Sequence, residues 1–254
     1  MNRKIELFMS IALLFCAVFL ARQGAIFVQR QTAEGRARYM QSLSTEDSST
    51  EDSDTPSVHS SFCIVVDAGH GGADPGKVGI NDILEKDINL SIALRLAEEL
   101  ESAGISVVLT RTSDVDLSNG ASNFKSSDMR NRCALITEAN PIFTISIHQN
   151  SYPSEQVSGA QVFYFAESDE GKTLATTLQN SLIANVDPTN KRQPKANDSY
   201  YLLKKTPTPT VIVECGFLTN PTEAALLSTT EYQDKVVNAI FLGIMEYLES
   251  NDYL

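Results

Sequence analysis

Short apolar runs alternate with helical patterns along most of this chain, and this alternation limits the fold more than any other feature of the sequence. The runs that predict buried strands span residues 62–67, 105–110, 142–147, 159–165 and 209–214. Apolar residues at helical spacing predict helices over residues 87–102, 127–139, 173–186, 222–227 and 231–249. Residues 187–208 are mostly polar and contain proline, which predicts a loop. This order predicts an α/β fold, with a mostly parallel, twisted sheet of about five or six strands and helices on both faces.

The N-terminus has the pattern of an export segment. Arg3 and Lys4 precede an apolar run over residues 7–21, which places the basic residues on the inner side of a membrane. The run is short for a spanning helix, but Arg22 can snorkel and lengthen the span. Because no convincing small-x-small cleavage site follows, we expect residues 1–30 to form an uncleaved anchor in the cytoplasmic membrane, with the remaining chain outside the cytoplasm. A cleaved signal and a secreted protein are the alternative.

Residues 31–61 separate this segment from the expected folded domain, residues 62–254. The stretch is polar, and positions 44–54 carry only acidic and hydroxyl side chains. Such a segment cannot bury enough apolar area to offset chain entropy, so we predict a disordered acidic linker rich in Ser and Thr. His59 lies inside it and is expected to be solvated. The formal net charge of −12 argues against a nucleic-acid partner, because phosphate binding needs clustered Lys and Arg.

Side chains that can bind a metal follow three of the expected strands. His70 comes just after the first strand in a glycine-rich loop, His148 closes the third, and Glu214 closes the fifth. The carboxyl ends of parallel strands meet at one edge of a sheet, so these side chains are expected to converge. Glu85 lies just before a helix, and the long loop after His70 can return it to the same edge. Two histidines and one glutamate as ligands, with a second glutamate as base, are the groups of a zinc hydrolase site.

Each of these residues also has a purely structural interpretation. His70 fits a tight turn, and His148 fits a hydrogen-bonded histidine at the end of a strand. Glu85 fits a solvated carboxylate in the first turn of a helix, where the helix dipole favours it. A carboxylate at the end of a buried strand is costly unless it is paired, so Glu214 fits half of a buried ion pair. The partners considered for that pair are Lys204 and Arg132.

The glycines around His70 do not form a dinucleotide-binding loop, because the third glycine of a GxGxxG pattern would stand at Asp74. The chain also has no CxxC pair, so a cysteine zinc site is not expected. The cysteines of the folded part lie in apolar patterns typical of small core residues. A disulfide between Cys63 and Cys215 is left open.

Four segments together resemble a known set of motifs. They read VDAGHGG at residues 66–72, LEK at 84–86, SIHQN at 146–150 and VECGFLTN at 213–220. These segments are similar to the motifs of the zinc-dependent N-acetylmuramoyl-L-alanine amidases of the Amidase_3 family, which cleave peptidoglycan. The resemblance runs from about residue 62 to residue 248. Arg111 and Arg132 also stand where the family has a strand-end arginine and a helix arginine.

The resemblance implies a specific mechanism. His70, Glu85 and His148 would hold Zn²⁺, and Glu214 would take a proton from water and return it to the leaving amine. The bond cut would join the muramic acid lactyl group to L-alanine. Asp67 would orient the His70 side chain without binding the metal itself.

The general layout resembles the CwlD-type branch, which acts on spore cortex peptidoglycan in cortex maturation or germination. Residues 151–210 leave no room for the helix that plugs the zinc site in some family members, so an open site is expected. The implied partners are peptidoglycan, the cytoplasmic membrane through the N-terminal segment, and an accessory protein of unknown identity. The same metal-binding groups also suit a stem peptidase, or a non-catalytic zinc- or glycan-binding module. Only an amidase would leave peptide-free muramic acid.

Overall fold

The computed structural model describes residues 62–254, so the expected anchor and linker at residues 1–61 lie outside the described part of the chain. Within residues 62–254, no helix is both long enough and apolar enough to cross a membrane.

A six-stranded sheet forms the centre of the domain, in the order β2-β1-β3-β6-β4-β5. Its strands are β1 (Cys63–Ala68), β2 (Ser106–Leu109), β3 (Phe143–Asn150), β4 (Gln161–Phe165), β5 (Lys195–Asn197) and β6 (Thr210–Phe217). β1, β2, β3 and β6 are parallel, whereas β4 pairs antiparallel with β6 and parallel with β5. The predicted α/β fold with a mostly parallel sheet is therefore confirmed.

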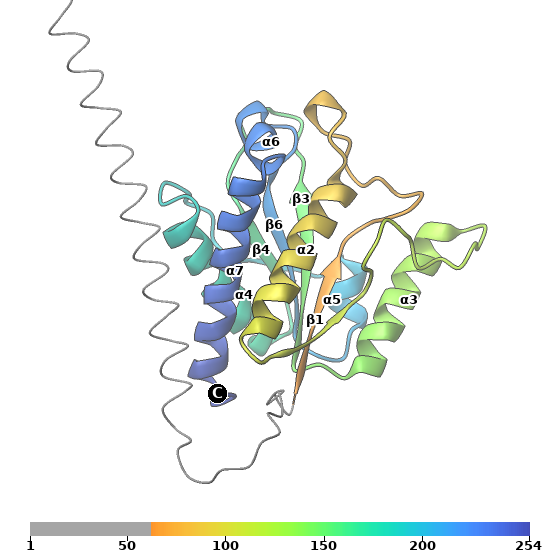
Figure 1. Cartoon of the computed structure of the whole chain (residues 1–254), viewed down its shortest axis with the longest axis vertical. Helices are drawn as coiled ribbons and strands as arrows, with labels where there is room; N and C mark the ends of the chain where they lie inside the picture. Colours follow the sequence, from red (N-terminus) through yellow and green to blue (C-terminus); the bar gives the residue numbers. More distant parts are fainter. Residues whose placement is uncertain (1–61) are drawn as a thin grey trace, which may run out of the picture. The chain divides into compact units, whose positions relative to one another are not determined.

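Helices cover both faces of this sheet, which explains why β6 is buried along its whole length. The helices are η1 (Ile80–Asp82), α2 (Glu85–Ser102), α3 (Phe124–Ala139), α4 (Asp169–Asn185), α5 (Tyr201–Lys205), α6 (Pro221–Leu227) and α7 (Thr230–Ser250). Figure 1 shows α2, α4 and α7 packed together on one face, with α3 and α5 on the other.

The antiparallel direction of β4 follows from the connection before it. Residues 151–160 between β3 and β4 contain no helix, and a parallel crossover needs about a dozen or more residues, usually with a helix. The chain therefore turns at the carboxyl edge of the sheet, and β4 runs back along β6 with Gln161 opposite Glu214.

The loop expected at residues 187–208 contains two short elements, β5 and α5, so that prediction is wrong in part. A five-residue helix shows no usable periodicity and depends on tertiary packing. Leu202 of α5 packs with Val65 and Cys133, and Leu203 packs with Phe163 and Ile212. These two leucines fix α5 on the sheet.

The carboxyl ends of β3 and β6 place two of the candidate residues side by side. His148 and Glu214 are register partners, and the ladder is irregular between His148 and Asn150. Side chains alternate between faces along a strand, so Glu214 lies on the same face as Ile212, which contacts α5. Cys63, at the start of β1, and Cys215, near the end of β6, are both free, so they form no disulfide.

Candidate functional site

Three of the predicted side chains meet in one cluster. The ligand atoms of His70, Glu85 and His148 all lie within 4.8 Å of one another. Glu85 Oε1 is 3.2 Å from His70 Nε2 and 2.9 Å from His148 Nδ1. Ligands held 2.0–2.2 Å from a tetrahedral zinc are about 3.3–3.6 Å apart, so a modest separation of these atoms would admit the ion. The cluster therefore suits a small divalent metal.

Glu85 is the first residue of α2, not a residue before the helix as the sequence suggested. Its side chain is buried, and its oxygens accept hydrogen bonds from the backbone N–H of Lys77 at 2.8 Å and of Gln149 at 3.1 Å. Asn89, one turn further along α2, donates from 3.3 Å. Burial alone would raise the pKa of Glu85, but the hydrogen bonds and charges of His148 and His70 hold it far below its usual range. Glu85 is thus a permanent anion at the centre of the cluster.

His70 has a left-handed backbone with φ 61°, which is unfavourable for a residue other than glycine. Two arginines stabilise this conformation. Arg132 donates to the carbonyl oxygens of His70 and Ala68 at 2.5 and 2.8 Å. Arg111 donates to the carbonyl oxygens of Ala68 and Gly69 at 2.9 and 3.1 Å. The loop that presents His70 is therefore fixed by charge-assisted hydrogen bonds to successive carbonyls.

Asp67 does not contact the imidazole of His70, so the expectation that it steers that ring is wrong. Its carboxylate pairs with Arg132 Nη1 at 2.6 Å and accepts hydrogen bonds from Ser146 at 2.6 Å and Thr110 at 2.7 Å. Burial opposes ionisation, but the Arg132 charge and these hydroxyls hold the pKa of Asp67 at about 2. Asp67 thus acts on the His70 loop through Arg132, which holds the backbone of that loop.

His148 is positioned by strand β3 and by the absence of a side chain at Gly69. A Cβ atom placed on Gly69 would lie 2.3 Å from Nε2 of His148, well inside van der Waals contact. Only glycine at this position leaves room for the ring. This close approach explains in physical terms why glycine precedes His70 in the motif.

Glu214 lies beside the cluster and is 7% exposed. Its Oε2 has no hydrogen-bond partner among the described residues, and no ion pair of Glu214 is found there either. Arg132, one of the partners considered, binds Asp67 and Asp128 instead. Burial and the negative charge of Glu85 raise the pKa of Glu214, whereas the two histidines lower it. The net result is a pKa of about 7. A buried carboxyl without a partner and with such a pKa suits a general base.

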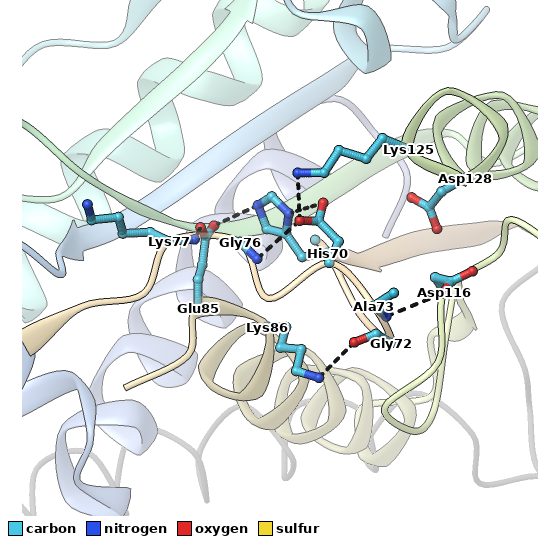
Figure 2. A network of polar contacts seen from close by, with 12 residues as sticks. His70, Gly72, Ala73, Gly76, Lys77, Glu85, Lys86, Asp116, Lys125 and Asp128 are labelled. Atoms are coloured by element: carbon cyan, nitrogen blue, oxygen red, sulfur yellow. Dashed lines mark hydrogen bonds and ion pairs between the residues drawn. The ribbon is translucent and has the colours of Figure 1, made fainter. Parts of the chain in front are cut away.

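A cavity of about 550 Å³ contains the cluster and Glu214. Its other wall residues include Lys125 and Met129 from α3, and Tyr200 and Tyr201 at the start of α5. Figure 2 shows His70 between Glu85 and the side chain of Lys125. Because α5 forms a wall of this cavity and does not fill it, space remains for a substrate beside the cluster.

Some residues of the site were not found from the sequence. Asp74 accepts a hydrogen bond from His70, and Asn89 and Gln149 hold Glu85 and each other. The Asn89 position carried a usable signal, because it stands four residues after Glu85 on one face of a helix. For Asp74 the only signal in the sequence is its four-residue spacing from His70.

Comparison with known proteins agrees with this geometry. The Amidase_3 family, described as N-acetylmuramoyl-L-alanine amidase, matches residues 64–246. The germination-specific N-acetylmuramoyl-L-alanine amidase of Bacillus subtilis (strain 168) is 41% identical over 188 residues, which cover 72% of this chain and 78% of that protein.

Solved structures give the same result. The CwlD amidase from Clostridioides difficile, determined in complex with the GerS lipoprotein, matches with a TM-score of 0.72 and 40% identity over 74% of this chain and 99% of that one. AmiC2 of Nostoc punctiforme, an N-acetylmuramoyl-L-alanine amidase, matches with a TM-score of 0.66 and 34% identity over 75% and 99% of the two chains. The chain therefore belongs to the Amidase_3 family and is an N-acetylmuramoyl-L-alanine amidase, an enzyme that acts on peptidoglycan.

Proposed function

We propose that this amidase is zinc-dependent, that His70, Glu85 and His148 are the zinc ligands, and that Glu214 is the catalytic acid–base group. One observation carries the proposal. Glu214 is buried with an unpaired Oε2, at the register position next to His148 and in the same cavity as the three-residue cluster. A buried carboxyl without a partner is costly, and a reaction that needs a proton acceptor at this place accounts for it.

The donor set is that of a catalytic zinc site, with two imidazoles, one carboxylate and a fourth position open to water. Bound zinc would polarise the lactyl carbonyl and lower the pKa of a water molecule beside it. Glu214 Oε2 would accept a proton from the attacking water as the water oxygen bonds to the lactyl carbonyl carbon, because its pKa of about 7 makes the ionised form available near neutral pH. The same carboxyl then donates the proton to the amine of L-alanine as the amide bond breaks.

Removal of either histidine should abolish stable zinc binding. We expect elemental analysis to find one zinc per wild-type chain and little zinc in His70→Ala or His148→Ala, since a site with two ligands holds the ion far more weakly. His59→Ala is the matched control, because His59 is the third histidine of the chain and lies in the expected linker. Full zinc occupancy in both His70→Ala and His148→Ala would refute the ligand assignment.

We further propose that the substrate is spore cortex peptidoglycan. The support is the 41% identity to the germination-specific amidase of Bacillus subtilis. Spores made without this protein should then contain little peptide-free muramic acid in their cortex, and a normal amount would contradict the role. The CwlD amidase of Clostridioides difficile was solved with a lipoprotein, so we propose a lipoprotein as the accessory partner, to be tested by co-purification.

We also propose the domain order expected from the sequence, with an anchor at residues 1–30, an acidic linker at 31–61 and the catalytic domain at 62–254 outside the cytoplasmic membrane. A linker of this length gives a flexible reach of roughly 30 Å from the membrane. Mass spectrometry of the protein from membranes should detect the intact N-terminal segment. A new N-terminus shortly after Ala21 or Ala25 would show a cleaved signal instead.

A further inference from the structure

The two histidines of the cluster use different ring nitrogens. His70 turns Nε2 toward Glu85 and Nδ1 toward Asp74, whose Oδ2 is 2.9 Å away. A neutral imidazole carries one hydrogen, so Nε2 has a free lone pair only when that hydrogen is on Nδ1. The carboxylate of Asp74 is placed to accept the hydrogen there. It therefore holds a hydrogen on Nδ1 and leaves Nε2 as the nitrogen that can bind a metal.

Asp74 is itself held firmly. Its backbone exchanges two hydrogen bonds with Gly71, both 3.0 Å long. Its other oxygen, Oδ1, is 2.9 Å from Lys125 Nζ and accepts a longer hydrogen bond, 3.4 Å, from the N–H of Gly76. Figure 2 shows Lys125 reaching from α3 toward this loop beside His70. Because both oxygens have donors and the main chain is fixed, the carboxylate cannot rotate freely.

His148 is positioned in another way. Its Nδ1 faces Glu85, and the ring packs directly on Gly69 at the end of a buried strand. His70 has no such strand around it, because it lies in a loop with a left-handed backbone. The orientation of the His70 ring therefore depends on its hydrogen bond more than that of His148 does.

From these contacts we infer that Asp74 is a positioning residue for His70: it accepts the Nδ1 hydrogen and fixes the ring, so that Nε2 is the nitrogen that faces the metal site. The inference rests on the proposed zinc site, and it assigns to Asp74 a role in metal affinity. Partners of this kind behind a metal-bound histidine typically change metal affinity about 10–100-fold. Asp74 does not touch the reacting atoms.

The test compares the zinc dissociation constants of full-length variants, measured by competition with a chelator of known affinity. The Asp74→Asn side chain has a single, uncharged oxygen. If this oxygen stays at His70 Nδ1, the NH₂ group of the amide faces the ammonium group of Lys125 and repels it. We expect about 10–100-fold weaker zinc binding, with the melting temperature of the metal-free protein nearly unchanged. Asp116→Asn is the matched control, because Asp116 accepts a hydrogen bond from Ala73 in the same loop without touching a histidine.

Lys125→Met distinguishes two roles for Asp74: orienting the His70 ring, and attaching α3 to the loop. It removes the ion pair with Asp74 but leaves the contact between Asp74 and His70, so zinc affinity should stay within about 3-fold of the wild type. If Asp74 only attached α3 to the loop, Lys125→Met would reproduce the loss seen in Asp74→Asn, and the inference would fail. Equal zinc affinity in Asp74→Asn and wild type would also overturn it. A wild-type protein that binds no zinc would instead refute the proposed metal site.

A second measurement does not depend on zinc. Long-range ¹H–¹⁵N spectra report which ring nitrogens carry a hydrogen, and the chain has only three histidines to assign. In the metal-free wild type, His70 should carry a hydrogen on Nδ1 that is hydrogen-bonded to Asp74. In the Asp74→Asn variant the resonance of that hydrogen should shift upfield or be lost to exchange with water, because its charged acceptor is gone, whereas the resonances of His148 should be unaffected. An unchanged His70 spectrum in the variant would contradict the assigned role.

Discussion

Glu214→Gln should fold normally, keep its zinc and lose nearly all turnover. The amide has almost the shape of the carboxyl and Oε2 has no partner to lose, so the fold has little reason to change. The amide cannot take a proton from water, however, and positioned acid–base groups usually contribute about 10²–10⁴-fold. The measurement is release of stem peptide from peptidoglycan, with zinc content and melting temperature determined on the same preparation.

Glu223→Gln is the matched control for this variant. Glu223 is a half-buried carboxylate of α6 near the end of β6, and its oxygens accept hydrogen bonds from the backbone N–H of Gly159 and of Phe217, both at 2.8 Å. An amide has one accepting oxygen, so one of these donors loses its partner and the fold should lose about 1–3 kcal/mol. Activity per folded molecule should persist. If Glu214→Gln instead kept its turnover, the proposed base would be wrong.

Arg132→Met should have the largest effect on stability. The guanidinium is 1% exposed and is the ionic partner of Asp67, which is equally buried. Removal of one member of a buried ion pair leaves an unpaired charge and typically costs about 3–5 kcal/mol. The free energy of unfolding in urea measures the loss. The double variant Asp67→Asn with Arg132→Met removes that charge and should recover part of the stability. Its loss in free energy of unfolding should be smaller than the sum of the losses in the two single variants, and a larger loss would contradict this account.

The pH dependence gives an independent check on the same pair. In the folded wild type the pKa of Asp67 is about 2, below the value of 3.8 for a free side chain. A lowered pKa means that the contribution of Asp67 to stability is fully present above pH 4 and is lost as the pH falls toward 2. In Arg132→Met the largest opposing charge is gone while burial, the two hydroxyl donors and the weaker effect of His148 remain, so the pKa of Asp67 should rise. Mild acid should therefore stabilise that variant relative to its value at neutral pH, opposite to the wild type.

Much of the fold could be predicted because its elements are long and regular. The helices α2 and α7 repeat apolar residues at helical spacing, and the predicted ranges agree with the structure to within about two residues. The short elements β5 and α5 could not be predicted, because they have too few residues to show a periodic pattern. Their positions depend on contacts with residues far away in the sequence. In the sequence, Leu202 and Leu203 form an isolated apolar pair. Their packing partners lie on the sheet and on α3, far away along the chain.

The site divides in the same way. The proximity of His70, His148 and Glu214 could be predicted, because each lies at the end of a strand and the ends of parallel strands meet at one edge of the sheet. Most of their supporting contacts could not, since Arg132 binds Asp67 and the His70 loop across separations that no local pattern records. Arg132 reaches from α3 to a carbonyl 62 positions earlier in the chain. The sequence thus indicated which groups we propose to carry the chemistry, but not what orients them.

The left-handed backbone of His70 has a consequence for how changes elsewhere in the fold reach the site. Arg111, just after β2, donates to the carbonyl oxygen of Gly69, and Arg132 of α3 donates to that of His70. The backbone of this loop is therefore tied to α3 and to the end of β2. A substitution that shifts α3 on the sheet should move His70 with it, even where the substituted residue lies far from the cavity.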